Sequence, residues 1–158
     1  MTATLAITFD LGRYHATPWG ANVNEGAVEI PPSPWRLLRA LYSTWRVHAN
    51  DLPQDLVHGL LSTLAATEPV YAVPPHTIAH TRHYYPDSTS RRGTTSTDKT
   101  IDAFAAFATT DASLYVTWPV ELSPDYRDAL ERLAKSLPYL GRADSVITAK
   151  LTSAPDEY

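Results

Sequence analysis

Ten residues near the middle of the chain, HTIAHTRHYY, combine side chains that could bind or cleave a polyanion. They include His76, His80, His83, Arg82 and Tyr84, and they precede a polar segment whose cations are Arg91, Arg92 and Lys99. Aromatic rings interleaved with cations are typical of surfaces that bind single-stranded RNA, because bases stack on rings and phosphates pair with cations. We therefore predict an RNA-contacting segment here.

The histidines also allow two kinds of chemistry. A metal-independent ribonuclease could use imidazoles near a ribose 2′-hydroxyl, with His15, His80 and His83 as the candidate catalytic residues. A three-histidine metal site is disfavoured, because strand alternation places His76 and His80 on one side and His83 on the other. We expect no metal and no cofactor.

A second group of polar and aromatic residues lies in GRYHATPWGANVNEG, residues 12–26, and includes Arg13, Tyr14 and His15. The helix signal that follows carries Arg36, Arg39 and Arg46, which line one edge of a helix. Arginine suits phosphate because its planar fork donates two hydrogen bonds at once. A solvated helix flank is the competing interpretation.

Composition narrows the class of protein. The 158 residues carry a net charge of -4 and include no cysteine, which excludes thiol nucleophiles and cysteine-ligated metals. Residues 12–48 hold four Arg against two Glu, so positive charge is concentrated beside the candidate residues. The first ten residues lack a signal-peptide pattern and no stretch is apolar enough to span a membrane, so we expect a cytoplasmic protein.

The elements expected to position these residues begin with a strand over residues 3–11, whose alternation predicts one buried face. Ser33 and Pro34 then start a helix, and a shorter helix ends before Pro69. The spacing predicts that these helices bury Trp35, Leu38, Leu41, Tyr42 and Trp45, and Leu56, Leu60, Leu61 and Leu64.

The second half of the chain reads as strands around one more helix. Residues 69–86 predict two short extended pieces, and residues 87–100 predict an exposed loop or hairpin tip. Residues 101–110 and 112–120 are expected to pair with each other through a turn. Ser123 and Pro124 start a helix that buries Tyr126, Leu130, Leu133 and Leu137 before a stop at Gly141, and a strand over residues 145–153 follows.

This order predicts an α+β fold of the ferredoxin-like type, a split βαβ with an antiparallel sheet that RNA-recognition domains share. We expect a single domain over residues 1–158, with residues about 76–100 forming a projecting hairpin or loop.

Four segments in order, GRYHATPWGANVNEGAVEIPPSPWRLLRAL, HTRHYYP, DKTIDAFAAF and LPYLGRADS, resemble a known family. They look like the N-terminal signatures of the CRISPR-associated Cas-five/Cas-six fusion proteins of type I-G systems, formerly called I-U. The resemblance implies a Cas-five-like domain, and the Cas-six-like half of that family, which would process precursor RNA, is expected to be absent.

The resemblance implies a subunit of a Cascade-type antiviral complex that holds the 5′ handle of CRISPR RNA and packs against backbone and large subunits. The positions within matched motifs that would contact RNA are Arg13, His15, Arg36, Arg82, His83, Tyr84 and Arg142. RNA binding and assembly without catalysis is the leading hypothesis. A precursor-processing endoribonuclease and a protein-only interaction domain are the alternatives.

Overall fold

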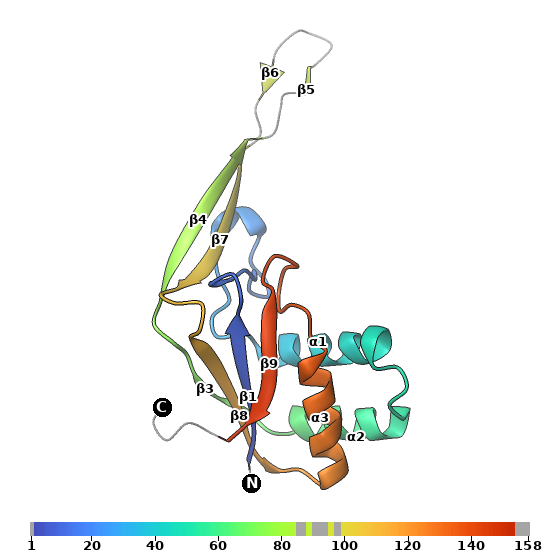
Figure 1. Cartoon of the computed structure of the whole chain (residues 1–158). Helices are drawn as coiled ribbons and strands as arrows, with labels where there is room; N and C mark the ends of the chain where they lie inside the picture. The colour runs from blue at the N-terminus through green and yellow to red at the C-terminus, as the bar shows by residue number, and fades with distance from the viewer. Residues whose placement is uncertain (1, 85–87, 90–94, 97–98, 154–158) are drawn as a thin grey trace.

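A four-stranded antiparallel sheet forms the centre of the fold in the computed structural model, which describes residues 2–84, 88–89, 95–96 and 99–153 (Figure 1). Its strands are β1 (Thr2–Phe9), β3 (Val70–Ala72), β8 (Ser113–Glu121) and β9 (Ile147–Thr152). They lie in the order β3-β8-β1-β9, and each neighbouring pair is antiparallel. The chain is therefore α+β, as the sequence predicts.

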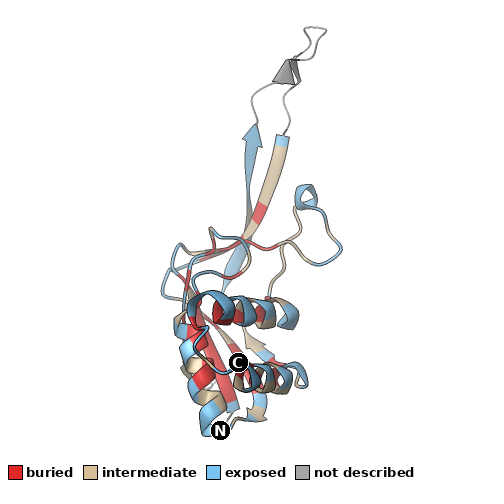
Figure 2. Cartoon of the chain, turned by 90° about the vertical axis from the view of Figure 1, so that its right-hand side faces the viewer, coloured by how far each residue is buried: buried red, intermediate tan, exposed pale blue. Residues whose placement is uncertain are grey.

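Three helices lie on the same side of this sheet (Figures 1 and 2). They are α1 (Pro34–His48), α2 (Gln54–Ala65) and α3 (Pro124–Lys135). The predicted starts of two of them are confirmed, because Ser33 accepts a hydrogen bond from Arg36 N and Ser123 accepts one from Tyr126 N. No helix among the described residues is long and apolar enough to cross a membrane.

The strand order is compatible with a ferredoxin-like fold. Helices α1 and α2 connect β1 to the edge strand β3, and α3 connects β8 to the other edge strand, β9. The apolar side chains of β1, Leu5, Ile7 and Phe9, pack with those of the helices in one buried core.

A second sheet contains several of the candidate residues. It consists of β2 (Arg13–Tyr14), β7 (Lys99–Phe107) and β4 (His76–Tyr84), in the order β2-β7-β4. The β4–β7 pair extends away from the body in Figures 1 and 2. The remaining elements are the short pair β5 (Ser88–Thr89) and β6 (Thr95–Ser96), and the 3₁₀ turn η1 (Val23–Glu25).

The prediction that residues 101–110 pair with residues 112–120 is wrong. Strand β7 lies between β2 and β4, whereas β8 lies between β3 and β1, so the two consecutive strands belong to different sheets. The junction is held where Phe107 N donates to Gly12 O at 2.9 Å, and the Phe107 ring stacks on Phe9 at 5.0 Å.

Two predictions of buried faces also need correction. Strand β1 is buried on both faces near its middle, because Thr4 and Ala6, which alternate with Leu5 and Ile7, are buried as well. In α1, Trp35 is 62% exposed and Tyr42 is 44% exposed. The buried stripe of this helix consists of Leu37, Leu41, Thr44 and Trp45.

Candidate nucleic-acid interface

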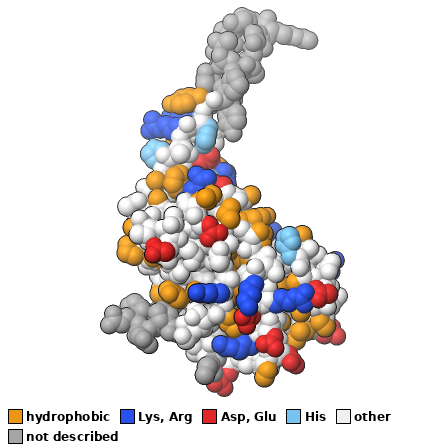
Figure 3. All heavy atoms as spheres, in the orientation of Figure 1, with side chains coloured by type: hydrophobic (Ala, Val, Ile, Leu, Met, Phe, Trp, Pro, Cys, Tyr) orange, Lys and Arg blue, Asp and Glu red, His pale blue; other side chains and the backbone are white. Residues whose placement is uncertain are grey.

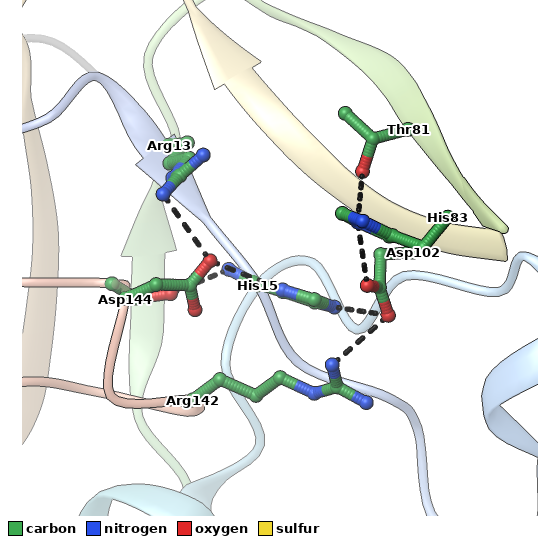
Figure 4. A network of polar contacts seen from close by, with 8 residues as sticks. Arg13, His15, Thr81, His83, Asp102, Arg142 and Asp144 are labelled. Atoms are coloured by element: carbon green, nitrogen blue, oxygen red, sulfur yellow. Dashed lines mark hydrogen bonds and ion pairs between the residues drawn. The ribbon is translucent and has the colours of Figure 1, made fainter. Parts of the chain in front are cut away.

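Six charged or titratable side chains meet where the second sheet joins the body (Figure 4). We call them the histidine–aspartate cluster. They come from β2 and the residue after it, from the β4–β7 pair, and from the turn before β9, and they are Arg13, His15, His83, Asp102, Arg142 and Asp144.

Asp102 is the carboxylate that joins the strands to the body. Its Oδ2 lies 3.1 Å from His83 Nε2, and its Oδ1 accepts a hydrogen bond from Arg142 Nη1 at 3.0 Å. The same Oδ1 lies 3.8 Å from His15 Nε2. Since His83 also meets the Thr81 hydroxyl at 3.1 Å, the carboxylate fixes several side chains at once.

Asp144 contacts the cluster from the other side of His15. Its Oδ2 lies 3.4 Å from His15 Nδ1 and 3.5 Å from Arg13 Nη2. His15 is only 4% exposed, so its ring is enclosed between two carboxylates, and each of its nitrogens faces one of them.

The backbone around His15 explains why the turn before β9 reaches the cluster. His15 N donates to Ser145 Oγ at 2.8 Å, and Arg142 N donates to His15 O at 2.9 Å. Gly141 allows this approach, because it has a φ of +85° and a Cβ there would lie 2.5 Å from His15 O. The sequence interpretation of Gly141 as a helix stop is wrong, since α3 ends at Lys135.

A second, partly buried network joins the loop before α1 to that helix. Arg36 Nε donates to Glu29 Oε1 at 2.6 Å, Arg36 Nη2 donates to Glu29 Oε2 at 3.1 Å, and Arg36 Nη2 also donates to Thr17 O at 2.8 Å. This bidentate ion pair between Arg36 and Glu29 holds the loop before α1 against the helix. The guanidinium of Arg36 therefore forms hydrogen bonds within the fold, while its side chain is 29% exposed and its contact with RNA stays a prediction.

Burial opposes ionisation of Glu29, but the hydrogen bond from Arg36 and the N–H of Ser33 outweigh it and lower the pKa of Glu29 below its usual value. Besides burial, the Glu29 carboxylate also raises the pKa of two neighbouring tyrosines, Tyr14 and Tyr71. Burial first, and then the charge of Glu29, raise the pKa of Tyr14 well above its usual value and that of Tyr71 to about 12.

Tyr14 is fully buried, and its hydroxyl lies 3.4 Å from Glu29. Its ring packs on Phe9 at a centroid distance of 5.1 Å. The prediction that Tyr14 contacts RNA is therefore wrong, because its ring is a core side chain that no base can reach.

Strand β4 is the opposite case, because all but one of its nine residues are exposed (Figure 2). Cross-strand register places Arg82 beside Ile101 and Tyr84 beside Lys99, and alternation puts His80 on the same side. We call this surface the ribbon face, formed by His80, Arg82, Tyr84 and Lys99. Among the residues that the structure describes, β4 pairs only with β7, so its outer edge is open.

The three candidate catalytic histidines are not brought together. His15 and His83 share Asp102, but His80 lies on the ribbon face, the other side of β4. Both nitrogens of His15 face carboxylates, so neither is open to a substrate proton. Within the described parts of the chain, no group of three or more His, Asp or Glu residues is placed to hold a metal ion.

The remaining predicted RNA contacts fall into three groups. Arg13 and Arg142 are about two-fifths exposed and take part in the cluster. Arg39 is exposed on α1, with its guanidinium 6.0 Å from the Trp35 ring. Arg91 and Arg92 lie outside the described residues.

Sequence reasoning missed three carboxylates, Glu29, Asp102 and Asp144. Asp102 is paired with Thr81 across the β4–β7 ladder, diagonally next to His83. Correct alignment of these two strands would have revealed it. No local pattern points to Asp144, which reaches His15 across 129 residues of sequence.

Basic side chains lie near the base of the β4–β7 pair and also across the body in Figure 3, with acidic side chains among them. This mixture of basic and acidic side chains fits the net charge of -4. No family model matches the chain, and no curated protein matches it either.

Proposed function

We propose that the chain is a Cas-five-like subunit of a type I CRISPR effector complex, where it binds the 5′ handle of CRISPR RNA and contacts the backbone and large subunits. Such a complex acts in the cytoplasm. The observation that carries the RNA-binding part is β4: its side chains are exposed, and they include His80, Arg82 and Tyr84 on one face. The family assignment rests on the resemblance of the sequence motifs.

The chemistry of the ribbon face suits a single strand. Tyr84 is 64% exposed and can stack on any base, while Arg82 and Lys99 lie exposed beside it to pair with phosphates. In this proposal the β4–β7 pair is the thumb-like projection, and the histidine–aspartate cluster joins it to the body through His83 and Asp102.

A binding role without catalysis agrees with the state of the histidines. His15 is enclosed between two carboxylates. Nε2 of His83 faces both the Asp102 carboxylate and the Thr81 hydroxyl, so this nitrogen is already engaged. Incubation of a single-stranded RNA with the protein in EDTA should leave the RNA intact. Shortened products would instead support the endoribonuclease alternative.

The binding proposal is tested with a fluorescein-labelled 12-nucleotide oligouridine, by anisotropy at several salt concentrations. Tyr84→Ala should weaken binding by about 5- to 150-fold, the range expected for one base stacked on an aromatic ring. Arg82→Ala should reduce the slope of log K against log salt by about 0.7.

The matched control is Lys150→Ala, which removes an exposed cation from β9 in the other sheet. It should bind as tightly as the unmodified chain. Equal affinity of the Tyr84→Ala and Arg82→Ala variants and the control would contradict the proposal. In the reconstituted complex, crosslinks from handle RNA should map to the ribbon face, and crosslinks confined to other surfaces would contradict the handle-binding role.

A further inference from the structure

A groove between α1 and α2 presents a second surface that the proposed RNA site does not use. It has a volume of about 670 Å³. We call it the helix groove, and its lining residues are Trp35, Leu38, Arg39, Tyr42, Arg46 and Leu61, with small side chains between them. Figures 1 and 2 place both helices on the body, away from the β4–β7 pair.

The residue types on this surface are unusual for a solvated helix. The exposed positions of α1 include Trp35 at 62%, Tyr42 at 44% and Val47 at 65%, and the helix contains no Asp, Glu or Lys. Aromatic side chains and arginine are the types enriched at the centres of protein interfaces, whereas lysine and glutamate are depleted there.

Tyr42, one of the two aromatic side chains that line the groove, is held in place by its neighbours. The Tyr42 ring meets Trp45 at a centroid distance of 5.5 Å and lies 6.3 Å from the ring of His58. Trp45 is buried, and its Nε1 donates to Leu52 O at 3.0 Å. A side chain that is already ordered loses little entropy when a partner covers it.

Two cations border the apolar floor. The guanidinium carbon of Arg39 lies 6.0 Å from the centroid of the Trp35 ring, and that of Arg46 lies 5.2 Å from the centroid of the Trp45 ring. Neither arginine forms an ion pair with any described residue. No acidic residue lines the groove. The helix groove therefore combines an apolar floor with uncompensated positive charge.

We propose that the helix groove binds an amphipathic, acidic α-helix of a partner protein. The apolar side chains of that helix pack on Leu38, Tyr42 and Leu61, and its carboxylates pair with Arg39 and Arg46. These two arginines are seven residues apart on α1, about 10.5 Å along the axis, which matches acidic residues one heptad apart on the partner.

Charge alone would also attract a nucleic acid, but the floor favours a protein helix. A nucleic acid could stack a base on an exposed ring and place phosphates beside the arginines. The rest of the floor, Leu38, Leu61 and Ala65, is aliphatic, and leucine or isoleucine side chains of a protein helix fill the space over it and remove it from water. The proposal does not depend on the RNA-binding role, because the groove shares no residue with the ribbon face.

The test is selection from a displayed library of helical peptides of about 16 residues, ~24 Å long, against the whole chain. Recovered peptides should carry apolar residues on one face and Asp or Glu seven residues apart. Their affinity should fall at least about tenfold with Arg39→Glu plus Arg46→Glu, and also with Tyr42→Ser, which leaves the charge unchanged.

The control is Lys135→Glu plus Lys150→Glu, which makes the same charge change at exposed positions outside the groove and should leave peptide affinity unchanged. Circular dichroism establishes that each variant is folded. The proposal is overturned if no peptide is recovered, if recovered peptides lack acidic residues, if the control weakens binding equally, or if a 12-nucleotide oligouridine displaces them from the groove.

Discussion

Carboxylates organise the chemistry of this chain at the scale of single residues. Asp102 and Asp144 face His15 from two sides, and Glu29 holds Arg36 through two hydrogen bonds. These acids hold the His15 ring and the Arg36 guanidinium in place, so both side chains stabilise the fold. The side chains of the ribbon face, by contrast, are exposed and free to meet a ligand.

Gly141 gives a prediction about the approach of the turn to His15. Gly141→Ala should destabilise the protein by more than Gly20→Ala, because both glycines have positive φ but only the Cβ at 141 would collide with a backbone oxygen. The left-handed conformation alone costs about 1–2 kcal/mol, and the collision adds to it. Urea unfolding of both variants measures the difference, and equal losses would contradict the close approach.

Glu29 gives a prediction about acid stability. Its pKa is lowered in the folded protein, so between the usual value of 4.5 and the folded value the unfolded chain binds more protons. The stabilisation is thus present above pH 4.5 and is lost as pH falls through the folded pKa.

We expect Glu29→Gln to be less stable than the unmodified chain at pH 7, with a difference that shrinks below pH 4.5. Because both proteins share the same exposed carboxylates, the contribution of those groups to the pH dependence of stability cancels in this comparison. Urea unfolding at a series of pH values measures the difference. If the difference in stability between the two proteins stayed constant down to about pH 3, roughly 1.5 units below the usual pKa of a glutamate, the result would contradict the role of the ion pair.

At the scale of elements, local signals in the sequence predicted more than long-range ones. The starts of α1 and α3 were predictable because Ser followed by Pro stabilises a helix terminus within one turn. The separation of β7 from β8 was not predictable, because it depends on the long-range pairing of β8 with β1 and of β7 with β4. The cluster was missed for the same reason: Asp102 meets His83 only through strand register.

Helix α1 shows how an apolar pattern can mislead. Trp35 and Leu37 are close in sequence, but only Leu37 is buried. Leu37→Ala should cost about 2–5 kcal/mol of unfolding free energy, as for other buried leucines, whereas Trp35→Ala should cost less than about 1 kcal/mol. Thermal or urea unfolding compares the two, and a larger loss for Trp35→Ala would show that the helix faces the core differently.

At the scale of the whole molecule, the two proposed surfaces lie on different parts of the chain. The ribbon face belongs to the β4–β7 pair, and the helix groove belongs to α1 and α2. An RNA and a partner helix can therefore bind together, which is the arrangement that a bridging subunit needs.

Simultaneous binding can be measured directly. Saturation with oligouridine should change the affinity for a selected peptide by no more than about twofold, because distant sites couple by less than ~0.5 kcal/mol. Calorimetric titration of peptide into the protein, with and without RNA, gives the coupling. Mutually exclusive binding would show that the surfaces overlap.

The open edge of β4 has a consequence for the protein when it is alone. A nine-residue strand with one unpaired edge is a template on which a second strand can add, and the exposed Ile78, at 55%, would favour such growth. The charge of Arg82 opposes the addition of a second strand. The chain purified without its ligands should therefore form larger species on concentration, and Arg82→Val should accelerate this, so the binding strand is also the part of the molecule most exposed to aggregation.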